Sequence, residues 1–141
     1  MVNEPYVAPP HSEAAAYHDP ADLPTVRTFV YAHALKAGLT TERAGCLTLA
    51  VSELVTNTLQ HTSGGGEVRI WTDGGRLHCD VIDGGPLRAF GRTMPAADAV
   101  GGRGLAIVER LCDEVRAIAV DGGTVVRMAF VIDPEPTATP S

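Results

Sequence analysis

Three polar residues on one predicted helix have types and spacing suited to metal and acid–base chemistry. Glu53, Asn57 and His61 recur every fourth residue, which aligns them along one side of a helix. The neutral side-chain oxygen of Asn suits a Mg²⁺ ion that phosphate groups already neutralise, and a Glu carboxylate can orient or deprotonate a nucleophile near that metal. By itself, however, the pattern favours a solvated helix flank, on which Glu and Asn are common.

A second candidate lies where a predicted strand ends in Asp83, followed by Gly84 and Gly85. The Asp carboxylate can accept a hydrogen bond from a ligand donor such as the exocyclic amine of adenine, and the glycines let a planar base approach the backbone. The alternative is an ordinary turn, because Asp-Gly is among the commonest turn pairs. This motif alone does not decide between the two interpretations.

A third candidate is a glycine-rich run at 101–105 that leads directly into a predicted helix. Gly102 and Gly104 would leave backbone N–H groups free at the positive end of the helix dipole, which suits a phosphate. Arg103 is the natural counter-charge for a terminal phosphate, because Lys36 is the only lysine of the chain. The alternative is a flexible loop that only begins the helix.

The hydrophobic periodicity predicts the elements that must position these residues. Two helices are expected, from Asp22 or Leu23 to Gly38 and from Thr40 or Thr41 to about His61. A hairpin of strands 67–72 and 77–82 follows, and then a loop at 83–103. The last elements are a helix at 104–113 and a hairpin of strands 115–120 and 124–132. This order predicts an α+β fold with one mostly antiparallel sheet and helices on one face.

The chain length of 141 residues predicts one domain. We place it at 21–133, between proline-rich tails at 1–20 and 134–141 that are expected to be disordered. A short strand at 14–18 is the alternative for part of the first tail.

The final hairpin turn, Gly122-Gly123-Thr124, is explained by the hairpin alone and does not by itself indicate a ligand site.

Charge excludes several functions. With 11 Lys+Arg against 17 Asp+Glu, a net charge of −6 and one lysine, the chain cannot assemble the basic patch of a nucleic-acid binder, and a P-loop lysine motif is absent. The three cysteines are widely spaced among apolar neighbours, which predicts buried reduced thiols and a cytoplasmic location. No signal peptide and no membrane-spanning run is expected from the sequence.

Taken together, these motifs resemble the histidine-kinase-like (GHKL-type) ATPase domain, and most of all its small bacterial regulators, the anti-sigma-factor serine kinases. The resemblance covers about 23–132. It rests on an N box with Glu53 and Asn57, a first glycine box with Asp83 and Gly85, a second with Gly102 and Gly104, and a closing Thr124. The fold it implies is a two-layer α/β sandwich with a mixed, mostly antiparallel sheet.

The resemblance also implies residue roles. Asn57 would hold Mg²⁺ at the phosphates of ATP, and Glu53 would be the base toward a protein serine hydroxyl or a water. Asp83 would bind the adenine amine with Thr124 nearby. The remaining nucleotide-site residues are a lid and helix start around Gly102, Arg103, Gly104 and Leu105, together with Gly85 and a cleft-lining His61. Leu87 stands where the family's first glycine box has a second glycine.

The resemblance implies an ATP-binding regulator, expected to be an anti-sigma-factor-type serine/threonine kinase of bacterial transcription or stress signalling. A non-catalytic ATP-dependent interaction module and a glycine-rich domain without nucleotide are the alternatives, and the Glu53/Asn57 pair favours the first two. The implied partners are a sigma factor or an anti-anti-sigma antagonist, with a possible homodimer. The run Phe29-Val30-Tyr31 predicts either an interface or a helix buried on two sides.

Overall fold

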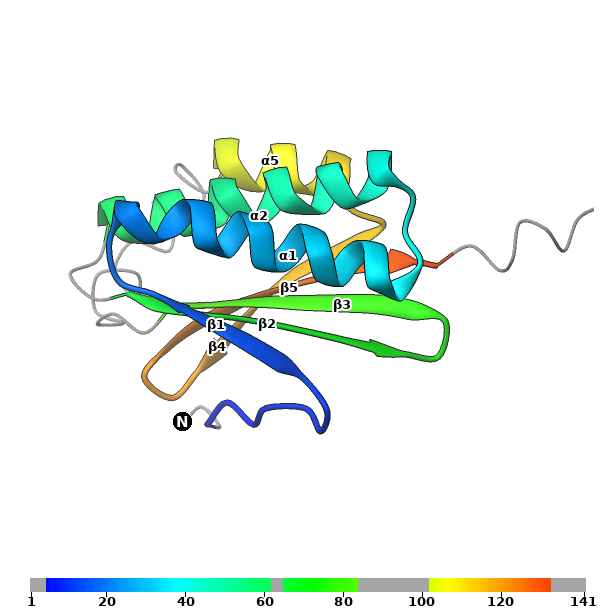
Figure 1. Cartoon of the computed structure of the whole chain (residues 1–141). Coiled ribbons are helices and arrows are strands. Elements are labelled where there is room, and N and C mark those ends of the chain that lie inside the picture. The colour runs from blue at the N-terminus through cyan, green and yellow to red at the C-terminus, as the bar shows by residue number, and fades with distance from the viewer. Residues whose placement is uncertain (1–4, 62–64, 84–101, 133–141) are drawn as a thin grey trace, which may run out of the picture.

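The computed structural model describes residues 5–61, 65–83 and 102–132, and the side chains at 61 and 102–106 lie outside this description. A five-stranded sheet is covered on one face by helices (Figure 1). The elements, in chain order, are β1 Glu13–Tyr17, the 3₁₀ turn η1 Pro20–Asp22, α1 Leu23–Ala37, α2 Thr41–His61, β2 Gly66–Asp73, β3 Arg76–Asp83, α5 Gly102–Leu111, β4 Glu114–Val120 and β5 Gly123–Val131. The predicted α+β class is therefore confirmed.

The sheet has the strand order β1-β2-β3-β5-β4, and every neighbouring pair is antiparallel. Two tight hairpins, β2–β3 and β4–β5, supply four of the strands and match the sequence prediction. Gly74 and Gly75 adopt positive φ angles of 61° and 80° in the first hairpin turn, which L-residues with a Cβ rarely adopt. The two hairpins meet where β3 pairs with β5, from Arg76 opposite Val131 to Asp83 opposite Thr124.

Helices α1 and α2 begin and end where the sequence predicts. Gly38, with φ 113°, ends α1 in a left-handed conformation, and its N–H donates to the carbonyls of Ala34 and Leu35. Before α2, the Thr40 hydroxyl accepts from the Arg43 N–H at 3.1 Å, as a helix cap does. These local signals fix the helix ends, and packing on the sheet fixes their faces.

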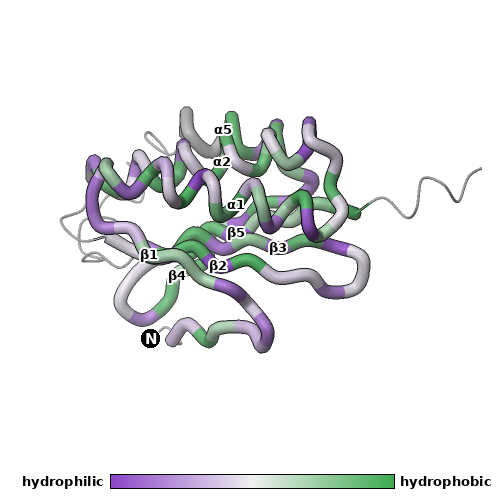
Figure 2. Tube along the Cα trace, viewed as in Figure 1, coloured by the Kyte–Doolittle hydropathy of each residue, from purple (hydrophilic) through white to green (hydrophobic). Residues whose placement is uncertain are grey.

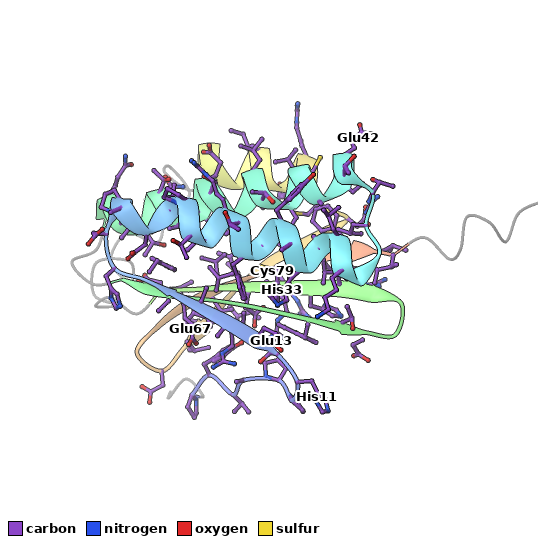
Figure 3. The ribbon with its side chains drawn as sticks, in the orientation of Figure 1. His11, Glu13, His33, Glu42, Glu67 and Cys79 are labelled. Carbon is purple, nitrogen blue, oxygen red and sulfur yellow. The ribbon has the colours of Figure 1, made fainter. Side chains whose placement is uncertain are left out.

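The core lies between the helices and one face of the sheet. Alternate strand residues point into it, as a pleated strand requires, and Figure 2 shows hydrophobic stretches along β3 and β5 with hydrophilic residues at the β2–β3 turn. Figure 3 shows Cys79 between the sheet and the helices. The buried core residues of the strands are Tyr17, Val68, Ile70, Leu77, Cys79, Val81, Met128 and Phe130.

The N-terminal boundary of the prediction needs correction. The segment assigned to a disordered tail at 1–20 contains β1, which pairs with β2 from Glu13 opposite Ile70 to Tyr17 opposite Gly66. The alternative strand is therefore the structure that forms, one residue earlier than predicted. Its three alanines bury little surface, so pairing with β2 rather than local sequence creates the strand. Residues 1–4 and the predicted tail 134–141 lie outside the described residues.

Helix α5 begins at Gly102 and ends at Leu111, two residues earlier at both ends than predicted. Its C-terminal limit has a clear cause, because the Asp113 N–H donates to the Ala129 carbonyl at 3.1 Å and joins the chain to β5. The Asp113 carboxylate in turn accepts from the Val131 N–H and from Arg43, each at 2.7 Å. Asp113 therefore links the segment between α5 and β4 to the end of β5.

The opposite face of the sheet is partly covered by the N-terminal segment (Figure 1). Asp80 is fully buried there and accepts two hydrogen bonds from Arg127 at 2.7 Å and one from the Tyr6 hydroxyl at 2.8 Å. The Arg127 guanidinium also lies 5.2 Å from the centre of the Trp71 ring. A buried carboxylate needs such partners, because an uncompensated charge away from water is costly.

Among the described residues, no helix is long and apolar enough to cross a membrane.

Candidate functional site

Three chain segments that carry predicted site residues lie at the same end of the molecule. Figure 1 shows the C-terminal end of α2, the end of β3 and the beginning of α5 toward the left of the view. Helices α1 and α5 both pack against α2, so α2 is the central helix of the layer. The hairpins and helix ends described above therefore gather motifs that are far apart in the sequence.

The two residues predicted at the adenine base are direct neighbours. Asp83 ends β3 and Thr124 lies opposite it in β5, in the Cα register of the antiparallel pair. The Asp83 side chain is 4% exposed, and Thr124 is half-buried. A buried carboxylate at a strand end is a strong acceptor for an N–H donor such as an exocyclic amine.

A glycine is required at position 123 by the close approach of two strands, which the sequence alone does not predict. A Cβ at this position would collide with the backbone carbonyl oxygen of Asp83. Gly122 before it has φ 88°, in the turn that ends β4. The Gly-Gly pair therefore allows β5 to begin close against the end of β3, which sets Thr124 beside Asp83.

Glu53 and Asn57 lie one turn apart on α2, and both are half-buried. The residues between them include Leu54 and Val55, which are buried in the core, whereas Gln60 near the helix end is exposed. The pair thus borders the core rather than standing on the fully solvated side of the helix. His61 is the last residue of α2, and its predicted cleft-lining role stays a prediction.

The second glycine motif forms the first turn of α5, where Gly102, Arg103, Gly104 and Leu105 occupy helical positions. The backbone N–H groups of a first helical turn have no partner within the helix and favour anions. The predicted phosphate roles of these residues stay predictions. Gly85 and the predicted lid lie outside the described residues.

Tyr17 is a site neighbour that the sequence analysis missed. Its ring is fully buried, and its hydroxyl donates to the Ile82 carbonyl at 2.9 Å. A second hydrogen bond joins it to the Thr58 side chain. Burial raises the pKa of Tyr17 above its ordinary value, the bond with Thr58 lowers it, and the nearby Asp83 carboxylate raises it. A single tyrosine beside a weak strand carries no sequence signal of this position.

The donor types at this end of the molecule fit a magnesium-bound nucleotide. A buried carboxylate stands at the strand end where a base amine would bind, and a neutral amide oxygen and a carboxylate lie on α2. The helix start at Gly102 suits phosphates. Among the described residues, no group of three or more His, Cys, Asp or Glu side chains forms a metal site. The one predicted magnesium ligand, Asn57, is an amide and does not belong to these four residue types.

Comparison with known families decides the identity of this arrangement. A sequence profile of the histidine kinase-like ATPase domain matches residues 17–130. The chain belongs to the histidine kinase-like ATPase domain family. The match begins at Tyr17 and ends at Phe130, so it includes the last residue of β1 and nearly all of β5, and it contains every predicted site residue. Family membership supports nucleotide binding, and ATP in particular.

Solved structures show the same histidine kinase-like ATPase fold. The crystal structure of the RsbU and RsbW domains of Rv1364c from Mycobacterium tuberculosis matches with a TM-score of 0.63 and 20% identity, over 88% of this chain and 32% of that chain. The histidine kinase domain of the blue-light activated histidine kinase EL346 from Erythrobacter litoralis matches with a TM-score of 0.51 and 28% identity, over 67% of this chain and 46% of that chain. This chain thus spans less than half of either. No curated protein matches it significantly.

Proposed function

We propose that this ATPase domain binds Mg-ATP and transfers its terminal phosphate to a serine or threonine of a partner protein, as an anti-sigma-factor-type kinase. The observation that carries the proposal is the half-buried pair Glu53 and Asn57 on α2. Next to Asn57, Thr58 is hydrogen-bonded to Tyr17, which also binds the carbonyl before Asp83. These contacts link the residue after Asn57 on α2 to the residue before Asp83 on β3.

Each residue has a separate task in this proposal. Asp83 accepts from the adenine amine, and Thr124 supports it from β5. Asn57 would hold the magnesium ion, which would supply positive charge that stabilises the phosphates. Glu53 orients the attacking hydroxyl and accepts its proton. The first turn of α5, from Gly102 to Leu105, donates backbone N–H groups to the phosphates, and Arg103 adds positive charge. Gly85 and His61 complete the proposed nucleotide site.

The proposed partner is a sigma factor or an anti-anti-sigma antagonist. The family match and the fold shared with the RsbU and RsbW structure support this class of partner. The second candidate function is a non-catalytic module in which ATP only sets the conformation that binds the partner. The half-buried Glu53 favours the kinase, because a binding module needs no base beside the metal.

The central claim is tested by nucleotide binding. Mg-ATP at millimolar concentration should raise the melting temperature of the chain, because a ligand that binds only the folded state stabilises it, by about 2.7 kcal/mol at a hundred times its Kd. Without Mg²⁺ the shift should be smaller. Absence of any shift, with or without Mg²⁺, would show that the proposed function is wrong.

The kinase claim is tested with two variants of α2. Asn57→Ala should lose magnesium-dependent ATP binding, whereas Glu53→Ala should keep it and lose phosphoryl transfer to partner proteins by roughly 100-fold or more. The exposed Gln60→Ala on the same helix is the matched control and should change neither. If both variants lose ATP binding equally, Glu53 belongs to the metal shell, and if wild type binds ATP but never transfers phosphate, the interaction module is the correct function.

A further inference from the structure

Tyr17 holds a buried hydroxyl where β1, β3 and α2 meet. The side chain is fully buried, and the hydroxyl donates to the Ile82 carbonyl at 2.9 Å while it shares a second hydrogen bond with Thr58. Ile82 precedes Asp83 in β3, and Thr58 follows Asn57 in α2. Both groups that the hydroxyl contacts are thus one residue away from a proposed nucleotide ligand.

Strand β2, which lies between β1 and β3, has a glycine where the Tyr17 side chain crosses it. Gly66 lies between Tyr17 and Asp83 in the strand register. A Cβ at Gly66 would collide with the Ile82 carbonyl oxygen and come within 2.5 Å of the Tyr17 hydroxyl oxygen. The tyrosine side chain therefore crosses the bare backbone of β2 to reach β3, an arrangement in which an aromatic ring covers a strand glycine.

The hydroxyl does more than fill space. A phenylalanine would occupy nearly the same volume, but it could not tie the end of β3 to α2. Hydrogen bonds in a water-excluded interior are stronger than at a surface, and a fully bonded network holds its members in one arrangement. The neighbouring Asp83 carboxylate and Asn57 amide would share that fixed geometry.

We propose that Tyr17 is a positioning residue of the nucleotide site: its hydroxyl sets the end of α2 that carries Asn57 against the end of β3 that carries Asp83. This inference rests on the proposed nucleotide function and deepens it. The distance between Asp83, which would bind the adenine, and Asn57, which would bind the magnesium ion, is then fixed. Loss of the hydroxyl should let this distance vary and weaken binding of the whole nucleotide.

The decisive variant is Tyr17→Phe, which keeps the ring and removes the two hydrogen bonds. Titration calorimetry with ATP and GTP, each with Mg²⁺, should show ATP affinity reduced about 5- to 10-fold. GTP affinity should fall less, because guanine does not offer Asp83 the adenine amine, so the preference for ATP should shrink. A merely structural tyrosine would change stability and leave this preference unchanged.

Tyr6→Phe is the matched control. Tyr6 also donates one partly buried hydrogen bond, to Asp80 at 2.8 Å, but Asp80 lies on the opposite face of the sheet. Urea unfolding followed by Trp71, the single tryptophan, should show a loss of stability in both variants. Only Tyr17→Phe should lose ATP affinity, measured on protein that remains folded at the assay temperature.

Thr58→Val provides an independent test through the second partner. It should weaken ATP binding to a similar degree, and combining it with Tyr17→Phe should add little, because both changes break one network. Fully additive effects, or unchanged ATP affinity in folded Tyr17→Phe protein, would overturn this inference alone. A wild-type chain that binds no nucleotide would overturn the proposed function and this inference with it. Should Thr58→Val not fold, Thr58→Ser keeps the hydroxyl and must bind ATP normally.

Discussion

At the scale of single residues, Asp83 should decide which base is bound. Asp83→Asn replaces a pure acceptor with an amide that also presents a donor, so ATP affinity should fall about tenfold or more. Isothermal titration of ATP measures this loss. The exposed Asp73→Asn at the far end of β2 is the control with the same chemical change, and an equal loss in both variants would mean that Asp83 does not read the base.

The half-buried Tyr6 and the fully buried Tyr17 predict how stability changes in alkali. Burial raises the pKa of Tyr6, and the hydrogen bond to Asp80 and the Asp80 charge raise it further; burial likewise raises the pKa of Tyr17. Because the folded pKa lies above the unfolded value of about 10, their contribution to stability is complete below pH ~10 and is lost as the pH rises beyond it.

Urea unfolding between pH 8 and 11 measures this dependence. The unfolding free energy should decline above pH ~10 in wild type and decline less steeply in Tyr6→Phe. Tyr31→Phe, at an exposed position, should follow the wild-type curve. A Tyr6→Phe curve with the wild-type slope would contradict the assigned role of the Tyr6–Asp80 contact.

At the scale of elements, two glycines should respond oppositely to alanine. Gly45 lies inside α2 with nothing within 4 Å of an added Cβ, so Gly45→Ala should stabilise the chain by up to about 1 kcal/mol. Gly66→Ala should destabilise it by roughly 1–3 kcal/mol, because the new methyl group meets Ile82 and Tyr17. Thermal unfolding of both variants distinguishes these effects, and stabilisation by Gly66→Ala would refute the described crossing of β2.

At the scale of the whole molecule, the exposed apolar residues of α1 bear on self-association. Of the apolar run on α1, Val30 is fully buried and Phe29 packs against the core, so the monomer uses both. Tyr31 and Leu35 remain at the surface of the same helix, 37% and 38% exposed. They are one turn apart, so they form one small apolar strip on α1.

The homodimer implied by the family resemblance is tested at this strip. If α1 forms the contact, light scattering should give a dimer mass for wild type and a monomer mass for the combined Tyr31→Ala and Leu35→Ala variant. ATP binding should be unchanged, because neither residue belongs to the nucleotide site. A strictly monomeric wild type at high concentration would exclude the dimer, and an unaffected dimer in the variant would place the interface elsewhere.

Local chemistry in the sequence was sufficient for most elements. Helix ends at Gly38 and Thr40, glycine turns in both hairpins, and apolar residues at the helical and strand periods each act over a few neighbouring residues, so they can be recognised without the fold. The motifs around Glu53, Asp83 and Thr124 were recognisable for the same reason, since each is a short pattern of residue types. Their membership of an ATPase family followed from the order of these patterns.

Tertiary structure alone decided what lies beside what. The alanine-rich β1 forms because β2 offers it a paired edge, and Tyr17 becomes a site neighbour only because its ring crosses Gly66 to reach Ile82. The register of β3 with β5 places Thr124 opposite Asp83, although the two residues are 41 positions apart in the sequence. Such contacts depend on long-range pairing and burial, which no local run of residues encodes. The sequence by itself therefore determined which residues could do the chemistry, and the fold determined which of them meet.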